Sequence, residues 1–303
     1  MKIAVLFAGS FFSPSLAGAF APSLLLSHQH CSTVTSTTLR AEGEAPQYET
    51  RNVVLLKAEP VGEDESAVLL HIDREEGDEE PFTYEPGHVL ALEIQYNATR
   101  DTHVDNKTMK DAQKNEMWMR GPYTVSAATP YTLNILTRTV GAKSRAFAQA
   151  EPGTPLRVGG KFKVPIAKGI SDQTKRVVLI STGVGIGPCV GAIEQMLSSG
   201  TEYTVDLISS FRFPNQVIYK TYLEFWQEAY EGKFTFIPIV TDEVGRLSAS
   251  DENLKLITDS NVCSLTQTHY HLIGNGQMVN EFKQGLLKAG VPKEKITLEV
   301  YFN

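Results

Sequence analysis

The chain has 303 residues, of which 42% are hydrophobic and 21% are charged, and this composition is that of an ordinary globular protein rather than of a disordered or membrane-embedded one. At about 100 to 200 residues per domain, the length predicts two domains besides a processed leader. The net charge is −7, and residues 1–41 contain only two charged side chains, both basic, so the remainder carries −9. This acidity excludes nucleic-acid binding, which needs Lys and Arg to neutralise phosphates.

Three cysteines, Cys31, Cys189 and Cys263, are far apart and show none of the paired spacings of disulfide frameworks or zinc sites. We therefore expect neither a disulfide nor a metal site. The apolar run at residues 3–12 is too short to span a bilayer as a helix, so we expect no membrane span.

Residues 1–45 have the composition of a targeting leader. Lys2 precedes the apolar run and small residues at 15–19, which is the pattern of a secretory signal, and an acid-free stretch rich in Ser and Thr follows as far as Arg40. This series is similar to the bipartite plastid leader of algae with secondary plastids, in which an aromatic residue, here Phe20, follows the cleavage point. The similarity implies delivery to the plastid (chloroplast). Secretion and an unstructured tail are the two alternatives.

Residues 46–168 alternate short apolar strands with turn signals, which predicts an antiparallel β-barrel as the first domain. The charged run at residues 73–80 is expected to form a solvated hairpin tip. The polar residues 97–118 are expected to form an inserted loop beside a site. The expected strands are residues 53–57, 66–72, 88–94, 123–127, 132–139 and 154–158.

From residue 169 to 303 apolar strands alternate with longer helical patterns, which predicts a Rossmann-like α/β domain with a parallel sheet. The boundary between the two domains is expected within residues 167–174. The expected strands are residues 176–181, 203–209, 234–240 and 269–273, and the expected helices are residues 186–199, 218–230 and 278–289.

Two glycine-rich turns follow buried strands in the second domain. Glycine lets a backbone approach a pyrophosphate closely, and a helix N-terminus supplies free N–H groups with a partial positive charge. Either turn alone could be a packing solution, but in a parallel sheet both lie at the carboxyl edge, where ligands bind. The candidate residues are Thr182, Gly183, Gly185 and Pro188 in the first turn, and Gly274, Asn275 and Met278 in the second.

In the first domain, residues 119–126 put a cation, an aromatic ring and two hydroxyls on one predicted strand. Arginine can clamp a phosphate, tyrosine can stack on a flat ring, and a hydroxyl can hydrogen-bond a ring nitrogen. The alternative is an ordinary barrel strand whose tyrosine faces the core. The candidate residues are Arg120, Tyr123, Thr124, Val125 and Ser126.

In this order the motifs make the chain from Tyr48 to Asn303 resemble the ferredoxin-NADP reductase superfamily. The resemblance implies a two-domain β + α/β fold, with an antiparallel FAD-binding β-barrel followed by a parallel-sheet NAD(P)-binding domain. It also implies an FAD-dependent oxidoreductase that transfers hydride or electrons between NAD(P)H and a partner. The remaining landmarks are residues 84–88, 141–144, 152–153, 158–162 and 298–301.

The resemblance further assigns roles to individual residues. Arg120 would contact the FAD phosphate, Tyr123 would stack on the isoalloxazine and Thr124 would lie beside flavin N5, with Val125 and Ser126 completing the segment. The FAD pyrophosphate would lie against Gly141, Lys143 and Ser144.

The resemblance gives the two glycine turns to the nicotinamide dinucleotide. Glu299 would lie near the nicotinamide, and Tyr301 would cover the second flavin face until the nicotinamide displaces it. With Thr124, these two are the expected catalytic residues. In such a site the cofactors carry the hydride chemistry, and the protein orients and shields them.

The sequence departs from the family pattern in three places. Gly121 and Pro122 separate Arg120 from Tyr123, where one residue is usual, and Ile273 stands where plant-type members have a cysteine. The third departure concerns the 2′-phosphate contacts, for which Arg212 and Arg246 are the candidates. Asp242 stands where NADP-preferring members often carry arginine, and its carboxylate would repel a phosphate. NADPH and NADH therefore both stay open.

Two further questions stay open at this level. A flavoprotein electron-transfer or docking subunit that no longer uses nicotinamide is the alternative function, supported by Ile273. The electron partner is unidentified, and the acidic body disfavours ferredoxin, itself acidic, unless a basic face exists. Candidates for that face are Lys107, Lys110, Lys114, Lys161, Lys163, Lys168, Lys175 and Arg176.

Overall fold

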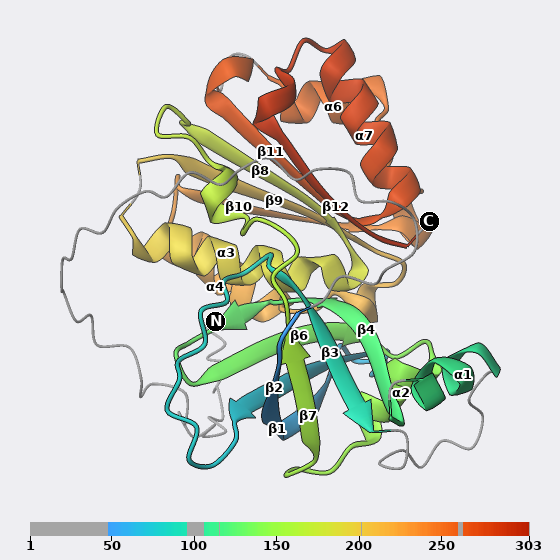
Figure 1. The fold of residues 1–303 in the computed structure, drawn as a ribbon. Helices are drawn as coiled ribbons and strands as arrows, with labels where there is room; N and C mark the ends of the chain where they lie inside the picture. Colours follow the sequence, from blue (N-terminus) through green and yellow to red (C-terminus); the bar gives the residue numbers. More distant parts are fainter. Residues whose placement is uncertain (1–47, 96–105, 115, 201, 260–262, 303) are drawn as a thin grey trace, which may run out of the picture. The chain divides into compact units, whose positions relative to one another are not determined.

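The structure, a computed structural model, describes residues 48–95, 106–114, 116–200, 202–259 and 263–302. Residues 47–303 form one compact unit. The expected leader, residues 1–45, lies outside the described residues. Two sheets make up the unit, and Figure 1 shows each with its helices.

The first sheet has seven strands in the order β4-β3-β7-β1-β2-β6-β5, and all its pairings are antiparallel. Apolar side chains alternate along its strands, as at Leu90, Leu92 and Ile94, and these pack with Phe147 of helix α2 in one core. The strands are β1 (Thr50–Val61), β2 (Ala67–Arg74), β3 (Val89–Gln95), β4 (Trp118–Thr124), β5 (Ala127–Ala128), β6 (Thr132–Arg138) and β7 (Pro155–Gly159). Two helices accompany them, α1 (Asn106–Lys114) and α2 (Ala142–Gln149).

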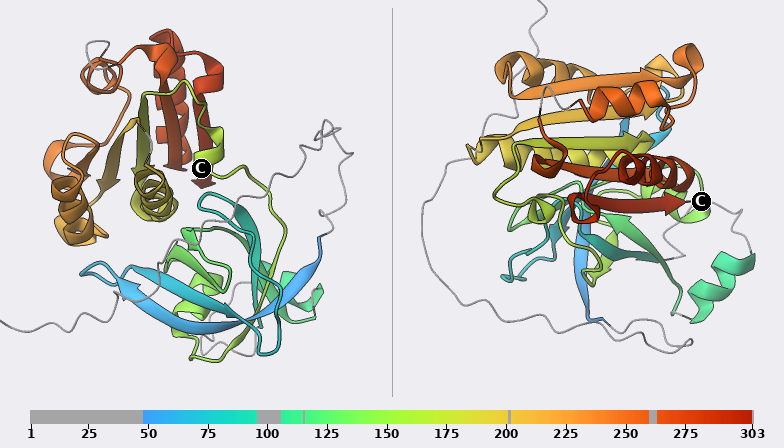
Figure 2. Two further views of the ribbon diagram at one scale, coloured as in Figure 1. Left: turned by 90° about the vertical axis from the view of Figure 1, so that its left-hand side faces the viewer. Right: turned by 90° about the horizontal axis from the view of Figure 1, so that it is seen from above.

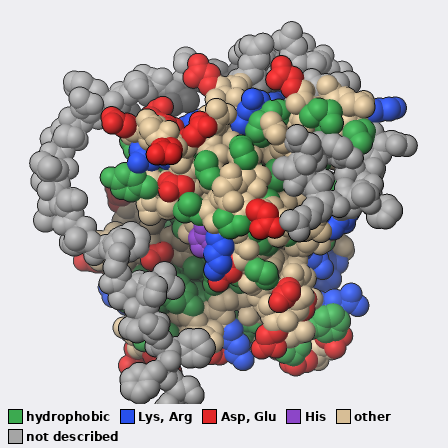
Figure 3. Space-filling view, turned by 90° about the horizontal axis from the view of Figure 1, so that it is seen from below, with side chains coloured by type: hydrophobic (Ala, Val, Ile, Leu, Met, Phe, Trp, Pro, Cys, Tyr) green, Lys and Arg blue, Asp and Glu red, His purple; other side chains and the backbone are tan. Residues whose placement is uncertain are grey.

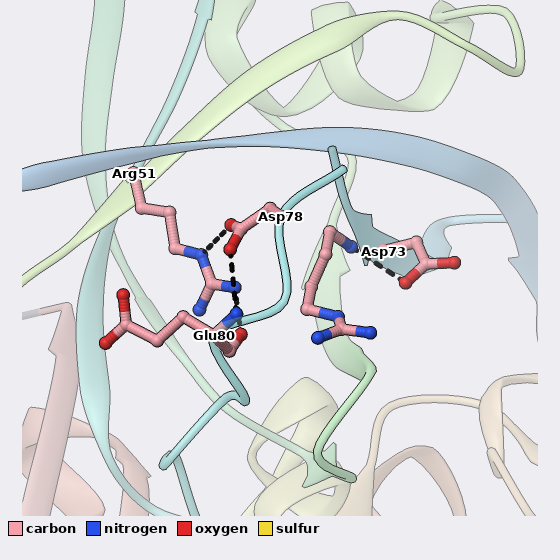
Figure 4. Close-up of polar contacts among 5 residues, drawn as sticks. Arg51, Asp73, Asp78 and Glu80 are labelled. Carbon is pink, nitrogen blue, oxygen red and sulfur yellow. Dashed lines mark hydrogen bonds and ion pairs between the residues drawn. The ribbon is translucent and has the colours of Figure 1, made fainter. Parts of the chain in front are cut away.

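Most of residues 73–80 are exposed, as expected of a solvated charge run, but they do not form the expected hairpin tip. Strand β2 continues to Arg74, but its neighbours are β1 and β6, and the chain leaves it for β3 on the far side of β7. The segment is also tied down. Arg51 of β1 donates from Nε to the Asp78 carboxylate at 2.5 Å and from Nη2 to the carbonyl of Glu80, as Figure 4 shows. An arginine far away in the sequence thus organises what reads locally as a solvated charge run.

The expectation of a loop at residues 97–118 also needs correction. Its described part contains helix α1, and β4 begins at Trp118. The helix is short and polar, and only Ala112 of its described side chains is fully buried. With only Met109 and Ala112 as apolar residues, the segment is too polar to be recognised as a helix from its apolar pattern.

The second sheet has five strands in the order β10-β9-β8-β11-β12, all parallel. Chain order reverses between β8 and β11, so the ends of these two strands form the switch point at which ligands bind in such sheets. The strands are β8 (Arg176–Thr182), β9 (Thr204–Phe211), β10 (Phe234–Val240), β11 (Thr268–Asn275) and β12 (Ile296–Phe302). The α-helices are α3 (Ile186–Ser198), α4 (Lys220–Ala229), α5 (Thr241–Val244), α6 (Asp251–Ile257) and α7 (Gly276–Lys288).

Helices cover both faces of this sheet, as Figure 2 shows. One core joins the sheet to α3 and α4, and another joins it to α6 and α7. The expected fold class is therefore confirmed, an antiparallel sheet followed by a parallel α/β unit. In the described part of the chain, none of the helices combines the length and the apolar character needed to cross a bilayer. Short 3-10 helices lie at Ala167–Gly169, Gly183–Gly185, Pro214–Gln216, Leu265–Gln267 and Lys293–Lys295.

The two sheets meet through helix α3. A Cβ built on Gly187 would lie 2.5 Å from Oγ of Ser126, and one built on Gly191 would lie 1.8 Å from the Ser126 carbonyl oxygen. Only glycine allows that approach. The expected boundary at residues 167–174 falls in the connection between β7 and β8, the last strand of one sheet and the first of the other.

Candidate functional site

A cavity of about 270 Å³ lies where β4 and β12 approach each other; we call it the junction cavity. Its walls come from both sheets and from the connection between them, so neither sheet alone could form it. The lining residues are Val89, Pro122, Tyr123, Thr124, Leu136, Thr137, Arg138, Val140, Lys163, Val184, Glu299, Val300 and Tyr301. The structure thus brings together four of the predicted site residues: Tyr123, Thr124, Glu299 and Tyr301.

Thr124 and Glu299 touch inside this cavity. The Thr124 hydroxyl donates a hydrogen bond to Oε1 of Glu299, across 175 positions of sequence. Glu299 is only 6% exposed. Burial raises the pKa of its carboxyl to about 7, against the opposing effects of the Thr124 hydrogen bond and the Lys163 ammonium. A carboxyl with this pKa can take up and release a proton near neutral pH.

Two tyrosines supply aromatic walls to the junction cavity. Tyr123 packs edge-on against Phe147 of α2, with ring centroids 5.4 Å apart, and burial raises the pKa of its phenol. Burial also raises the pKa of Tyr301, and the neighbouring Glu299 raises it further. Both phenols therefore stay neutral, and uncharged aromatic walls suit a planar apolar ligand.

The next two residues of the predicted flavin motif do not line the cavity. Val125 is fully buried in the core of the first sheet, and its N–H donates to the carbonyl of His88 at 2.9 Å. The Ser126 hydroxyl accepts from the N–H of Leu136 at 3.1 Å and packs beneath Gly187. Their described contacts are structural.

Arg120 is not brought into the junction cavity. Its Nε donates to Oε1 of Glu93 at 2.6 Å, and its guanidinium lies over the ring of Tyr48 at 5.2 Å. In an unbroken strand successive side chains alternate between faces, and β4 pairs with β3 without a bulge. With two residues between them, Arg120 and Tyr123 therefore face opposite sides of the sheet.

The N-terminus of α2 gathers the other predicted flavin-phosphate residues. Gly141 is the residue before the helix, and a Cβ there would meet no atom within 4 Å, so the backbone is open to a ligand. The Ser144 hydroxyl accepts from the N–H of Gly141 at 3.0 Å and so caps the helix. Lys143 reaches back to β4, where its Nζ donates to the carbonyl of Arg120 at 2.6 Å.

A second cavity, of about 380 Å³, lies at the carboxyl ends of β8, β9 and β11; we call it the strand-end groove. It shares Arg138 and Val184 with the junction cavity, so the two adjoin. The lining residues are Ser66, Ala67, Arg138, Thr182, Gly183, Val184, Ser210, Phe211, Arg212, Gln216, Ile218, Thr241 and Asn275.

The two glycine turns converge on this groove as predicted from a parallel sheet. The hydroxyl of Thr182 accepts from the N–H of Asn275 at 2.9 Å and so joins one turn to the other. Gly274 has φ +125°, and a Cβ there would lie 2.1 Å from the Thr182 hydroxyl oxygen. Gly183 has φ +53° and open space where a Cβ would point. Gly274 therefore serves the packing of the turns, while Gly183 leaves backbone free for a ligand.

Three other predicted residues lie behind these turns. Gly185 packs on the second turn, since a Cβ there would lie 3.1 Å from the carbonyl oxygen of Ile273. Pro188 is buried within the first turns of α3. Met278 is buried in the core beneath α7, although its N–H donates to Oδ1 of Asn275 at 3.2 Å. None of the three lines the groove, so the described contacts assign them to the support of the turns.

The candidates for a 2′-phosphate separate in space. Arg212 lines the strand-end groove, whereas Arg246 does not and instead pairs with Glu281 at 3.6 Å. Asp242 does not line the groove either, and its described contact is through the backbone, where its N–H donates to the carbonyl of Arg212 at 3.0 Å. The Asp242 carboxylate is thus not among the groups that line the groove.

Sequence reasoning did not find Arg138 as a site residue, and it placed Lys163 only among surface lysines. Both line the junction cavity. Cys189 is fully buried in the core between α3 and the sheet. Its thiol nevertheless lies close enough to Glu299 for the carboxylate to add to the rise in pKa that burial causes. No local motif marks these residues, because their relevance depends on which distant segments they face.

Three of the residues proposed for a basic face form ion pairs with acidic side chains. Arg176 is buried and pairs with Asp206 at 2.7 Å, while Lys168 pairs with Glu85 at 2.7 Å. Lys175 pairs with Glu202 at 3.3 Å. On the face drawn in Figure 3, acidic and basic side chains are interspersed where the described residues are visible. Among the described residues no group of three or more His, Cys, Asp or Glu side chains could hold a metal ion.

Comparisons with known proteins agree with this geometry. Residues 179–284 match the model of the oxidoreductase NAD-binding domain. The search of curated proteins found no match. A ferredoxin NADP+ reductase from Neisseria gonorrhoeae, solved with bound FAD and NADP, superposes with a TM-score of 0.62 at 21% identity over 83% of this chain and 98% of that one.

Two further solved structures share the fold at lower identity. The ferredoxin-NADP+ reductase of Plasmodium falciparum with 2′P-AMP gives a TM-score of 0.58 at 14% identity over 83% of this chain and 96% of that one. The flavohemoglobin of Malassezia yamatoensis with bound FAD and heme gives 0.66 at 16% identity over 83% of this chain, which spans only 60% of that protein. Residues 179–284 thus match the oxidoreductase NAD-binding domain, and the chain shares the two-domain fold of the ferredoxin-NADP+ reductase structures.

Proposed function

We propose that the protein is an FAD-dependent oxidoreductase that moves electrons between NAD(P)H and a separate electron partner. The observation that carries the proposal is the contact between Thr124 and Glu299 in a cavity that adjoins the strand-end groove. A flavin in one cavity and a nicotinamide dinucleotide in the other would meet at this pair. Enzymes gain much of their rate from such fixed juxtaposition of the reacting groups.

The residues present fit a flavin. The junction cavity is near the lower end of the usual range for ligand sites, about 300 Å³, which suits a ring system rather than a whole dinucleotide. Its tyrosine walls suit a planar apolar ring, and the Thr124 hydroxyl is a hydrogen-bonding group inside it. We assign the flavin phosphates to the open N-terminus of α2 at Gly141 and to the Lys143 ammonium.

When bound, the flavin supplies the redox chemistry, accepting a hydride from NAD(P)H, which leaves as NAD(P)+, together with one proton from the surroundings. The chain's own residues would orient the two cofactors and handle that proton. Glu299 can hold this proton at Oε1, and the Thr124 hydroxyl can relay it by giving up its own proton as it takes up the one from Glu299. The neutral phenols of Tyr123 and Tyr301 would keep water from the ring.

For the nucleotide we propose NADPH rather than NADH. Arg212 lines the strand-end groove and Asp242 does not, so the groove offers a guanidinium without an opposing carboxylate from α5. Arg246 forms an ion pair with Glu281, so Arg212 is the better of the two candidates for binding a 2′-phosphate. A guanidinium is well suited to a phosphate because it offers several donors in one plane.

Stopped-flow mixing of the flavin-loaded full chain with NADPH and with NADH, without oxygen, tests the proposal. We expect the oxidised flavin absorbance to bleach with both nucleotides, and faster with NADPH. If neither nucleotide bleaches the flavin, the protein is not an NAD(P)H oxidoreductase. The alternative, a flavoprotein electron-transfer subunit that no longer uses nicotinamide, would then be favoured. Failure to bind any flavin would overturn both.

We further propose delivery to the plastid, on the composition of residues 1–45. A fusion of these residues to a fluorescent reporter tests this, and export of the reporter from the cell would contradict it. Ferredoxin as the partner has little support, since the basic residues proposed for its docking are partly buried or paired. Binding of the purified protein to ferredoxin at low and high salt would decide that question.

A further inference from the structure

Lys163 is held at the wall of the junction cavity by its chain neighbours. The N–H of Phe162 donates to the carbonyl of Val89 at 2.9 Å, and the N–H of Ile166 donates to the carbonyl of Pro86 at 3.1 Å. These bonds fasten the connection between β7 and β8 to the first sheet on both sides of Lys163. Its side chain lines the same cavity as Glu299.

The groups that face Glu299 differ in charge. Thr124 hydrogen-bonds its carboxyl, and Tyr301 and Cys189 are neutral because burial raises the pKa of each. Arg138 and Lys163 are the two cations that line the cavity, and Lys163 is the one whose charge acts on the Glu299 carboxyl. Within the described residues it forms no ion pair closer than 4.0 Å, so no carboxylate at that range neutralises its ammonium.

We propose that Lys163 is a positioning residue of this site, whose ammonium stabilises negative charge in the junction cavity, first on the Glu299 carboxylate and then on a bound flavin as it is reduced. This inference rests on the proposed function for its second half only. The first half concerns two residues of the chain and needs no cofactor. Glu299 is buried, so water screens its carboxylate less than it would at the surface, and a nearby cation acts on it more strongly. Burial disfavours the charged form of Glu299, and Lys163 opposes that effect.

Lys161 is a matched control two residues away. Its Nζ donates to the carbonyl of Thr83 at 2.8 Å and lies over the ring of Tyr84 at 5.3 Å, and it does not line the junction cavity. Lys161→Met therefore removes the same charge from the same segment without touching the cavity. Lys163→Arg keeps the charge in the cavity, whereas Lys163→Met removes it. Lys163 is exposed, so none of its variants should prevent folding.

The first measurement uses the protein without flavin. A pH titration of the Glu299 carboxyl by ¹³C NMR, with the signal assigned through Glu299→Gln, gives the pKa directly. We expect Lys163→Met to raise it, while Lys163→Arg and Lys161→Met leave it unchanged. An unchanged pKa in Lys163→Met, or an equal rise in Lys161→Met, would overturn the first half of the inference.

The second measurement is the midpoint potential of the bound flavin. We expect Lys163→Met to lower the ratio of reduced to oxidised flavin at a fixed potential about tenfold, which is about 30 mV for a two-electron couple. Lys163→Arg should restore the wild-type value. If NADPH still bleaches the flavin of Lys163→Met but the midpoint potential is unchanged, Lys163 does not stabilise the reduced flavin. That result would overturn the second half of the inference and leave the proposed function intact. A protein that binds no flavin would overturn the proposed function but not the carboxyl titration.

Discussion

Arg120 on β4 and Glu93 on β3 stand directly opposite each other in an antiparallel pair, and the arginine donates from Nε to the glutamate at 2.6 Å. The Glu93 side chain is 2% exposed and that of Arg120 is 37% exposed. The pair therefore joins a buried carboxylate to a guanidinium at the edge of solvent. Tyr123 lies on the other face of β4, and Arg120 is not among the residues that line the junction cavity.

We expect Lys143, and not Arg120, to provide the charge that recognises the flavin phosphates. FAD carries phosphates and riboflavin carries none, so the ratio of their dissociation constants isolates phosphate recognition. Lys143→Met should weaken FAD binding roughly tenfold or more relative to riboflavin, since a charged hydrogen bond contributes about 1.5–3 kcal/mol. Arg120→Met should change both ligands alike. Fluorescence titration with each flavin measures this.

The Arg120 variant needs a stability control, because removing one partner of a buried pair costs up to about 3–5 kcal/mol. In Arg120→Met with Glu93→Leu an apolar pair replaces the ion pair, and this double variant should regain most of that loss. A selective loss of FAD binding in the double variant would show that the guanidinium does reach the phosphate.

The sequence predicts the two sheets well because their apolar patterns are clear. In the first sheet apolar residues recur at every second position, and in the second sheet buried apolar strands alternate with helical patterns. Through the family resemblance the sequence also assigns Thr124 to the flavin and Glu299 to the nicotinamide, but it does not predict the direct contact between them. It fails where contacts come from distant segments, as with Arg51 fastening Asp78 or Lys163 facing Glu299. The orientation of Arg120 could have been predicted from the sequence. Two residues, rather than the usual one, separate it from Tyr123, and in a strand this spacing puts the two side chains on opposite faces.

Burial of Glu299 should make the folded protein less stable as pH rises. Its pKa is raised from 4.5 to about 7, so the folded state holds a proton that the unfolded state has lost between these values. The stability from this group is full below pH about 4.5 and is lost as pH rises through about 7. Glu299→Gln should therefore stabilise the protein relative to wild type by about 3 kcal/mol at pH 8 and hardly at pH 4.5.

Urea unfolding of flavin-free wild type and Glu299→Gln at pH 4.5, 6 and 8 measures this difference. The glutamine keeps an oxygen that can accept the Thr124 hydrogen bond, so the comparison changes charge and little else. A stability difference that does not vary with pH would contradict the burial of an ionisable carboxyl at this position.

Two buried histidines should give the opposite dependence at acid pH. Nε2 of His269 and Nδ1 of His271 each lie 2.9 Å from the Thr297 hydroxyl. Burial lowers the pKa of His269 to about 4 and that of His271 to about 3. Both stay neutral in the folded state, whereas in the unfolded state they bind protons below the ordinary pKa of about 6.5.

Stability from these histidines is therefore full above pH about 6.5 and is lost as pH falls towards about 4 for His269 and about 3 for His271. At pH 5 the expected loss is about 2 kcal/mol for each histidine. His271→Phe should be less stable than wild type at pH 7.5, because it leaves Thr297 with fewer partners, yet its stability should fall less between pH 7.5 and 5. Urea unfolding at the two values gives both slopes, and equal slopes would show that His271 charges freely in the folded protein.

Arg212 and Arg246 offer a matched test of nucleotide choice, because both were candidates for the 2′-phosphate and only Arg212 lines the strand-end groove. Arg212→Ala should raise the KM for NADPH tenfold to a hundredfold, in keeping with about 1.5–3 kcal/mol for a charged hydrogen bond, and leave the KM for NADH nearly unchanged. Arg246→Ala should alter neither, since its guanidinium is directed to Glu281. Steady-state kinetics with both nucleotides measures the four ratios. If Arg246→Ala is instead the variant whose KM rises for NADPH and not for NADH, the 2′-phosphate lies outside the strand-end groove. The assignment of Arg212 would then be wrong.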